Sequence, residues 1–418
     1  MTKENGKPQI RFAKFKDTWE QRKLGEMMEV TSVKRIHQSD WTDSGVRFLR
    51  ARDIVAESKK ENVSEPLFIS QEKYDEYSAV SGKVKKGDLL VTGVGTIGVP
   101  MLINSEEPLY FKDGNIIWFK NENVIDGRFF YYSFNGLNIQ KFIKESAGLG
   151  TVGTYTIENG KKTPINLPPK KDEQAKIGEY FFNLDHLITL HQRKYDKLTK
   201  AKKSMLEKMF PKNGTNVPEI RFKGFTDAWE QRKLGELSSS FEYGLNAAAK
   251  EYDGENKYIR ITDIDDDSRE FKQEDITSPD TDLSSAENYR LSEGDILFAR
   301  TGASVGKSYI YKVSDGLVYY AGFLIRARIM SEYNAEFVFQ NTLTYEYEKF
   351  IKVTSMRSGQ PGVNAQEYSK YQIMVPSKPE QDKISDCFRS LDNLITLHQR
   401  KLEKLKILKK ACLEKMFV

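Results

Sequence analysis

The sequence has few of the residues that cross-link chains or bind metals. Only two cysteines, Cys387 and Cys412, and four histidines occur among its 418 residues. The two cysteines lie 25 positions apart on one expected helix, so they cannot form a disulfide with each other. No Cys/His spacing typical of a zinc site is present. We therefore expect a protein of the reducing cytoplasm that binds no metal itself.

Long hydrophobic runs are missing as well. No stretch is long and apolar enough to span a membrane, and the N-terminal residues lack the hydrophobic core of a signal peptide. Apolar residues make up 39% of the chain and charged residues 30%, as in a globular protein with polar helices. The sequence thus predicts two or three packed domains and no membrane partner.

Motifs of nucleotide, methyl-transfer and nuclease chemistry are also missing. The segment Gly302–Ser308 is one residue shorter than a P-loop, and no GxGxxG follows an expected strand. No Asn/Asp-Pro-Pro-aromatic motif is present. Acidic residues near Asp53 and Asp263 superficially resemble a metal-dependent nuclease site, but their spacings differ between the two halves of the chain. We predict that the chain is not an enzyme and holds no cofactor.

What the chain does have is an internal repeat. Residues 173–210 return at 380–417, with 24 of 38 positions identical and no gap. Neither copy contains proline, and the single glycine, Gly178, lies in the first turn. Each copy therefore predicts one long helix.

Each expected helix carries a narrow apolar seam with alternating spacings of four and three, which is typical of a coiled coil. The equivalent His191 and His398 are interpreted as polar seam contacts and not as metal ligands. The seam residues are Ile177, Phe181, Leu184, Ile188, His191 and Leu198 in the first copy and Ile384, Phe388, Leu391, Ile395, His398 and Leu405 in the second.

Charge predicts the direction of pairing. In each copy the first half has a net charge of −2 and the second half a net charge of +5. Antiparallel pairing sets each basic half against an acidic half, whereas parallel pairing sets two basic halves together. The alternative is that each helix packs only on its own domain, with its basic residues in solvent.

A second repeat shows that the chain is a tandem duplication. Residues 8–26 return at 218–236 with 14 of 19 positions identical. By this symmetry, residues 8–26 should lie near the end of the second helix, as residues 218–236 lie near the end of the first. The expected parts are a first domain at 1–172, a helix at 173–212, a second domain at 213–379 and a helix at 380–418.

The two domains resemble each other only in places. Short β-branched and aromatic runs between Gly, Asn and Asp predict strands, and residues 127–144 and 335–352 each predict a local helix. The expected fold class is α/β (α+β), with two tandem mixed α/β domains separated by two long antiparallel coiled-coil helices in a pseudo-twofold duplication. Closely similar helices with divergent domains indicate one scaffold that carries two different binding surfaces.

The candidates for contact with DNA lie around two matching features of the domains: the segments 47–54 and 257–264, and the glycine loops 93–98 and 302–306. Arginine and glutamine can make bidentate contacts to bases. Surface salt bridges, and a plain tight turn for each glycine loop, are the alternatives. The candidates are Arg50, Arg52, Lys59, Lys60, Thr92 and Thr96 in the first domain and Arg260, Arg300, Thr301, Ser304, Lys307, Arg357 and Gln360 in the second.

In the order of these features, the chain resembles the specificity subunits of type I restriction-modification systems over essentially its whole length. The features are the [FY]-[IL]-R-x-x-D-I segments at Phe48 and Tyr258, the glycine loops, the Glu-Gln pairs at Glu173 and Glu380, and the LDxLITLHQRK core of both helices. No single motif is specific, but their order and duplication are.

The resemblance implies that each domain is a target-recognition domain that reads one half of a split, asymmetric site in double-stranded DNA. It implies that the helices set the spacer and dock two methyltransferase subunits, with restriction (translocase) subunits as further partners. S-adenosylmethionine, ATP and Mg²⁺ would then belong to partner chains. A nuclease or methyltransferase acting alone, and a scaffold whose domains bind protein, are the rival functions.

Overall fold

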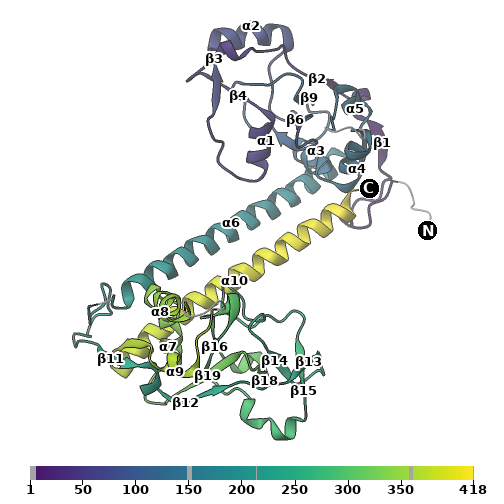
Figure 1. Ribbon diagram of the computed structural model, residues 1–418. Helices are drawn as coiled ribbons and strands as arrows, with labels where there is room; N and C mark the ends of the chain where they lie inside the picture. The colour runs from purple at the N-terminus through teal and green to yellow at the C-terminus, as the bar shows by residue number, and fades with distance from the viewer. Residues whose placement is uncertain (1–5, 148–152, 213, 357–360, 418) are drawn as a thin grey trace. The chain divides into compact units, whose positions relative to one another are not determined.

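A computed structural model of the chain describes residues 6–147, 153–212, 214–356 and 361–417. The chain forms two compact units (Figure 1). The first unit comprises residues 1–191 and 401–418, and the second comprises residues 192–400. Each unit thus contains one domain, here called a head, and part of both long helices, α6 (Lys171–Met209) and α10 (Lys378–Met416).

Among its described residues, the first head has two four-stranded sheets and a two-stranded ribbon. The sheet orders are β2-β9-β6-β7 and β3-β5-β4-β8, with β4 and β8 parallel, and the ribbon is β1-β10. The strands are β1 Glu20–Lys23, β2 Glu29–Thr31, β3 Trp41–Thr42, β4 Val46–Leu49, β5 Leu67–Ile69, β6 Leu89–Thr92, β7 Pro100–Leu102, β8 Leu109–Phe111, β9 Ile116–Lys120 and β10 Pro164–Leu167. The helices are α1 Ala51–Ser58, α2 Gln71–Ser81, α3 Gly127–Phe134, α4 Leu137–Ser146 and α5 Ile157–Lys162.

The described part of the second head has one four-stranded sheet, β12-β19-β16-β17, and the pairs β11-β20, β13-β15 and β14-β18. Its strands are β11 Glu230–Lys233, β12 Ser238–Tyr243, β13 Ala248–Glu251, β14 Lys257–Ile259, β15 Thr277–Asp280, β16 Asp295–Ala299, β17 Ser308–Ile310, β18 Val318–Tyr320, β19 Leu324–Ile329 and β20 Gln372–Val375. Its helices are α7 Ala335–Asn341, α8 Tyr345–Ser355 and α9 Ala365–Ser369.

The expected duplication is confirmed in the strand topology. The order β2-β9-β6-β7 of the first head returns as β12-β19-β16-β17, and the parallel pair β4-β8 returns as β14-β18. The ribbon returns as well, since Glu20 pairs with Leu167 and Glu230 pairs with Val375. The heads differ where β3 and β5 extend the parallel pair in the first head, whereas β13 and β15 form a separate antiparallel pair in the second. Each unit is therefore a mixed α/β domain on the same frame.

The Glu-Gln pair at the start of each long helix anchors that helix to its head. Arg11 holds the Glu173 carboxylate with two hydrogen bonds of 2.6 and 2.8 Å, and Arg221 holds Glu380 with bonds of 2.7 and 2.8 Å. Both glutamate side chains are only 1% exposed. A buried carboxylate is stable only when it is paired in this way.

The glutamine of each pair performs a second, equally repeated task. Gln174 accepts a hydrogen bond from the backbone N–H of Asp126, the residue that caps α3, and donates one to the carbonyl of Pro168. Gln381 makes the same two bonds with Asn334, the cap of α7, and with Pro376. In the sequence, the Glu-Gln pair was recognised only as a repeated motif. In the structure, it joins the start of each long helix to the start of a helix of the head, α3 or α7.

We expect the Arg11→Ala variant to lower the free energy of unfolding by about 3 kcal/mol, because it leaves the Glu173 carboxylate buried without its partner. Chemical denaturation measures this loss. The matched control is Arg22→Ala, which breaks the exposed Arg22–Glu26 pair and should cost less than about 0.5 kcal/mol. Equal losses for the two variants would contradict the anchoring role of Arg11.

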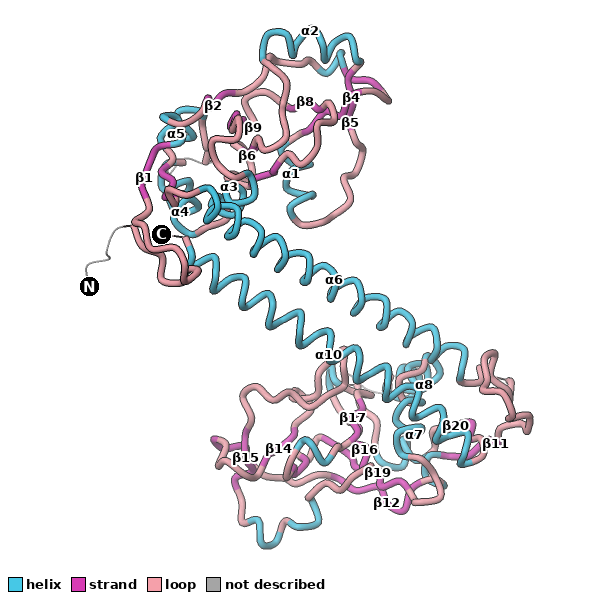
Figure 2. The backbone as a smooth tube through the Cα atoms, turned by 180° about the vertical axis from the view of Figure 1, so that it is seen from behind, coloured by secondary structure: helices cyan, strands magenta, loops and turns pink. Residues whose placement is uncertain are grey.

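Antiparallel pairing of the two helices is confirmed within each unit. In the first unit the Phe181 ring on α6 stacks on Phe417 at the end of α10, with centroids 5.5 Å apart. In the second unit Phe210, at the end of α6, packs on Phe388 near the start of α10 at 5.9 Å. The start of one helix thus lies beside the end of the other in both units (Figures 1 and 2).

The charge argument is confirmed by two equivalent ion pairs. Lys409 of α10 and Asp185 of α6 lie 2.6 Å apart in the first unit. Lys202 of α6 and Asp392 of α10 lie 2.6 Å apart in the second. In each unit a lysine from a basic half meets an aspartate from an acidic half, as the segregated charge predicts.

The seam residues do more than pair the helices. Ile177, Phe181 and Leu184 are buried in the core of the first head with α3, and Ile384 and Phe388 are buried in the core of the second. The alternative of helices packed on their own domains is therefore correct for the start of each helix, alongside the pairing. The remaining seam residues, Ile188, His191, Leu198, Leu391, Ile395, His398 and Leu405, are half-buried.

The N-terminal repeat lies where the duplication predicts. The backbone N–H of Ile10 donates to the carbonyl of Lys415 at the end of α10, at 3.1 Å. The N–H of Ile220 donates to the carbonyl of Lys208 at the end of α6, at 2.8 Å. The beginning and the end of the chain thus meet in the first unit.

Two expectations about helices need correction. Residues 127–144 form two helices, α3 and α4, because Gly136 begins a new helix after α3 ends. Residues 335–352 likewise divide into α7 and α8, because the Thr344 hydroxyl caps a second start. In Figure 2, where helices are cyan, α3 and α4 lie at the start of α6.

Among the residues described, no helix combines the length and the apolar character needed to cross a membrane.

Candidate nucleic-acid interface

The arginines of the two R-x-x-D-I segments are held in place by their own aspartates. Arg50 precedes α1 and donates to both carboxylate oxygens of Asp53, at 3.1 and 3.0 Å. Arg260 does the same with Asp263, at 2.8 and 2.9 Å. Both arginines therefore form salt bridges, as the alternative interpretation predicts. The bridge closes the turn of the chain that follows β4 in the first head and β14 in the second, which explains why both heads contain the R-x-x-D-I segment.

A basic hollow of about 510 Å³ opens beside Arg50 in the first head. Arg52 lies on its wall with a side chain that is 57% exposed and pairs with Glu65 at 3.5 Å, as the salt-bridge alternative predicts. Arg35 is 67% exposed and pairs with Asp113 at 3.0 Å. The buried Nε1–H of Trp41 meets no hydrogen-bond partner among the described residues. Cations around an aromatic donor suit a phosphate and an adjacent base. The lining residues are Arg35, Ile36, His37, Gln38, Trp41, Arg50, Ala51, Arg52, Lys112 and Asn115.

The other candidates of the first head, the two lysines after α1 and the two loop threonines, are not among the residues that line this hollow. Lys59 is exposed at the end of α1, and Lys60 donates to the Thr189 hydroxyl on α6. Thr92 is fully buried, and its hydroxyl donates to the carbonyl of Thr96. Thr96 itself is exposed. Only Thr96 of the two loop threonines can therefore reach a ligand without a change in the fold.

The glycine loops have a structural reason. Gly98 and Gly306 have φ angles of +76° and +83°, which favour glycine. A Cβ atom would lie 3.1 Å from Ile143 at the first and 2.7 Å from Ile351 at the second. These two glycines therefore let each loop pack on α4 or α8, as the tight-turn alternative predicts.

The most distinctive surface of the second head surrounds Arg300. Its guanidinium lies over the rings of Tyr243 and Phe323, 5.1 and 5.8 Å from their centroids. These rings are 44% and 57% exposed, which is unusual for large aromatic side chains. The buried Nε of Arg300 has no hydrogen-bond partner in the described part of the chain. A cation presented between two exposed rings is suited to stack on or bond to a base.

The two heads differ at this position. Gly93 donates its N–H to the carbonyl of Asn115 in the first head, and Arg300 donates its N–H to the carbonyl of Phe323 in the second. Arg300 therefore occupies the place of Gly93, and Phe323 the place of Asn115. One frame thus carries a basic hollow in one head and an aromatic-flanked arginine in the other.

Of the remaining candidates in the second head, Thr301 pairs with Gly362 in an isolated β-bridge beside Arg300. Ser304 lies on the same loop and is half-buried. Lys307 forms an ion pair with Asp266, in agreement with the salt-bridge alternative. Arg357 and Gln360 lie outside the described residues. Sequence reasoning missed Arg35, Trp41, Lys112, Tyr243 and Phe323, for which neither repeat nor spacing supplied a signal.

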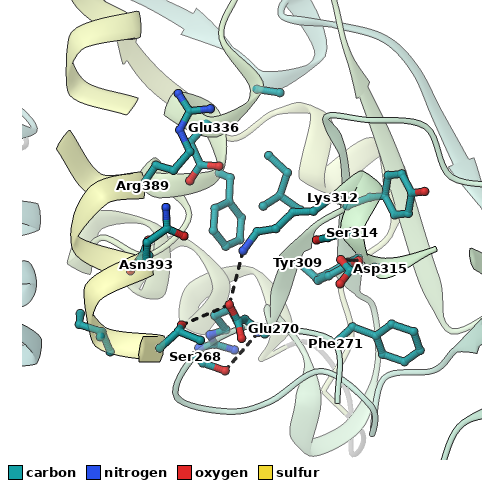
Figure 3. Close-up of a pocket in the computed structure, with 18 of the residues that line it drawn as sticks. Ser268, Glu270, Phe271, Tyr309, Lys312, Ser314, Asp315, Glu336, Arg389 and Asn393 are labelled. Carbon is teal, nitrogen blue, oxygen red and sulfur yellow. Dashed lines mark hydrogen bonds and ion pairs between the residues drawn. The ribbon is translucent and has the colours of Figure 1, made fainter. Parts of the chain in front are cut away.

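A larger cavity of about 1030 Å³ in the second unit has a different character (Figure 3). The Glu270 carboxylate on its wall accepts hydrogen bonds from Lys312 at 3.5 Å and from the Thr396 hydroxyl at 3.3 Å. Tyr309 donates to Asp315 at 2.7 Å. The lining of this cavity holds six acidic and six basic side chains, so the cavity lacks the one-sided positive charge that binds DNA.

Glu336 lines the same cavity, and burial raises the pKa of its carboxyl above the ordinary value of 4.5. Its carboxylate accepts a hydrogen bond from the Gln340 amide, which also donates to Asp392. At pH values above the raised pKa, the folded chain holds a poorly solvated negative charge on Glu336, which lowers the stability of the fold. At pH values below 4.5, the carboxyl is protonated in both the folded and the unfolded chain, so this cost is absent.

We therefore expect the Glu336→Gln variant to be more stable than the parent at about pH 7, by up to roughly 1 kcal/mol, with no difference at about pH 4. Thermal unfolding across this range measures the effect. Glu332→Gln, at an exposed position of the same head, is the control and should change nothing. A gain for Glu336→Gln that is equal at both pH values would contradict this explanation.

Within the described ranges, no group of three or more His, Cys, Asp or Glu side chains could hold a metal ion.

Comparison with known proteins places these features in a family. A family model described as the type I restriction modification DNA specificity domain matches residues 16–200 and 226–407. A protein of Haemophilus influenzae whose name describes it as a type I restriction enzyme specificity subunit is 32% identical to this chain over 171 residues. These residues cover 40% of this chain and 41% of that protein. The matched stretch thus spans less than half the length of that relative.

Two further similarities extend over more of the chain. The type I restriction enzyme MjaVIII specificity subunit of Methanocaldococcus jannaschii is 22% identical over 305 residues, which cover 70% of this chain and 69% of that protein. The crystal structure of a type I restriction-modification S subunit from M. genitalium superposes with a TM-score of 0.60 at 16% identity. The superposition covers 98% of this chain and 99% of the M. genitalium chain, so the two proteins share their fold over nearly their whole length.

Proposed function

Because the chain belongs to the family of type I restriction modification DNA specificity domains, we propose that it is the DNA-recognition subunit of a type I restriction-modification complex. In this role it carries no catalytic step. Each head reads one half of a split, asymmetric site in double-stranded DNA. The rival functions, an enzyme acting alone and a protein-binding scaffold, lack a comparable argument from the family.

The observation that carries the proposal is the contrast between the heads on their common frame. The first head offers the basic hollow with Trp41, Arg35 and Arg52. The second offers Arg300 between Tyr243 and Phe323, where the first has Gly93. Two different surfaces on one repeated frame suit two different half-sites. Base contacts from arginine and stacking on aromatic rings supply sequence preference, and the surrounding cations supply affinity for phosphate.

The long helices supply the partner surfaces in this proposal. The eight residues 187–194 are identical to residues 394–401, and each copy exposes two leucines. Two identical segments, each with two exposed leucines, suit two copies of the same partner, the methyltransferase subunit. Helix length then sets the spacer between the half-sites, since each residue adds about 1.5 Å.

The chemistry of the complex belongs to partner chains in this proposal. S-adenosylmethionine serves the methyltransferase subunits, and ATP and Mg²⁺ serve the restriction (translocase) subunits. The complex acts on DNA in the cytoplasm.

Methylation mapping of a strain that expresses this chain with its methyltransferase partner tests the proposal. We expect one split, asymmetric motif to be methylated, and no methylation without the chain. Purified chain alone should bind this motif in preference to other duplexes, with an affinity that falls as salt rises. Methylation or cleavage by the purified chain alone would favour the enzyme alternative, and absence of any DNA binding would favour the scaffold.

A further inference from the structure

The exposed leucines of the two long helices form one small surface in each unit. In the first unit Leu187 and Leu190 of α6 are 40% and 38% exposed. In the second unit their counterparts on α10, Leu394 and Leu397, are 44% and 45% exposed. Exposed leucines that recur at equivalent positions of both helices are candidates for a site of association when they belong to one contiguous patch.

A third leucine belongs to this surface in the first unit only. Leu408 of α10 is 44% exposed and precedes Lys409, whose ammonium meets Asp185 of α6. That ion pair sets Leu408 at the level of Leu187. Ala201 is the counterpart of Leu408 in the second unit, where it is exposed and precedes Lys202 in the equivalent ion pair with Asp392.

Helical geometry places the three leucines on the same side of the helix pair. At 100° per residue, Leu187, Leu190 and Leu408 are rotated about 80° to 140° from the seam in one sense. Ile407 is rotated by about 180° and therefore faces directly away from the seam. An antiparallel pair has a twofold axis across it, so equal rotations on its two helices lie on one side. Ile407, which is 69% exposed, lies on the face of α10 opposite the seam, about 100° from Leu408.

Basic residues border both surfaces. Lys401 and Lys404 of α10 are exposed on the leucine side in the first unit, and Lys194 and Lys197 of α6 are their counterparts in the second. The partner that fits is one with an apolar contact flanked by acidic residues. The two surfaces share this rim and differ at their centre, where one has Leu408 and the other Ala201.

From these observations, we infer that the two docking surfaces for the methyltransferase subunit are unequal, and that the surface of the first unit binds its copy more tightly. This rests on the proposed function, which supplies the identity of the partner. A leucine side chain buries more apolar surface than alanine does when the partner covers it. The expected difference in affinity is about tenfold, which corresponds to 1.4 kcal/mol.

Titration of the full chain with purified methyltransferase subunit, followed by calorimetry and by mass photometry, measures both steps. The parent chain should bind a first copy about tenfold more tightly than a second. Leu408→Ala should weaken the tight step and leave the weak step unchanged. Ala201→Leu should strengthen the weak step and leave the tight step unchanged. These two variants assign each step to one surface.

The control is Ile407→Ala, which removes a more exposed apolar side chain from the face of the same helix opposite the seam and should change neither step. All three substitutions are at exposed positions, so circular dichroism should show an unchanged fold. Two equal steps in the parent chain, or no response to Leu408→Ala and Ala201→Leu, would overturn the inequality and leave docking intact. Failure of the parent chain to bind any methyltransferase subunit would overturn the proposed docking as well.

Discussion

A chain that ends at Lys212 is expected to form a homodimer and, with the methyltransferase partner, to methylate a palindrome in place of the split asymmetric site. The reason is that α6 carries both sides of the contact that it makes with α10. In the first unit, Phe181 stacks on Phe417 and Asp185 pairs with Lys409. The counterparts of Phe417 and Lys409 on α6 itself are Phe210 and Lys202, which are identical residues.

A second copy of the truncated chain can therefore supply Phe210 to Phe181 and Lys202 to Asp185. Each of these contacts would form twice across a twofold axis. Two copies of the first head would then face the duplex, which requires an inverted repeat of the first half-site. Truncation thus changes the recognised sequence completely, without any substitution in the head that reads it.

Methylation mapping of a strain that expresses residues 1–212 with the partner measures this outcome, and sedimentation of the purified fragment measures its assembly. The control exploits the ion pair: Asp185→Lys in the fragment should prevent dimerisation, and the double variant Asp185→Lys with Lys202→Asp should restore it. Methylation of the original asymmetric site by the fragment would refute the two-head function. A monomeric fragment would refute only the equivalence of the helix contacts.

The second large effect is expected from Arg300→Ala. This variant should lower the affinity for the split site by about 10- to 100-fold, because one bidentate arginine contact discriminates bases by roughly 1–3 kcal/mol. The loss should be confined to the second half-site, so that binding to DNA with a scrambled second half-site barely changes. Competition binding with the two duplexes measures the difference.

Arg290→Ala is the matched control for Arg300→Ala. Arg290 is an exposed arginine of the same head, paired with Glu287, and its removal should leave the preference between the two duplexes unchanged. Tyr243→Phe keeps the ring beneath Arg300 and should retain most of the affinity. If Arg300→Ala weakens binding to both duplexes equally, the side chain contacts phosphate and reads no base.

The organisation of the chain was predictable from the sequence because the internal repeats, the hydrophobic periodicity and the distribution of charge along each helix indicate it. The seam of Ile177, Phe181 and Leu184 follows from spacing along one helix. The contact between Asp185 and Lys409 joins residues 224 positions apart, yet the segregated charge of both helices predicted it. Such features are properties of single segments, and the duplication tells which segments correspond.

The details of the heads were less predictable, because they depend on where one segment ends and on what packs against it. The break between α3 and α4 at Gly136 divides a run for which the sequence predicted one helix. Thr92 stands in a loop-like sequence, but the adjacent turn buries it against Thr96. Local preference for helix or loop is weak, and tertiary packing overrides it at such positions.

By itself, then, the sequence determined the duplication, the two antiparallel helices and the family, since each is recorded by residues close together in the chain or repeated along it. The tertiary structure alone decided the surfaces of the heads. Arg300 lies between Tyr243 and Phe323 because separate loops meet there beside the sheet. Trp41 and Lys112 share a hollow for the same reason. No period or spacing in the sequence predicts that these side chains come together, because their proximity is produced by the register and packing of strands that are distant in the chain.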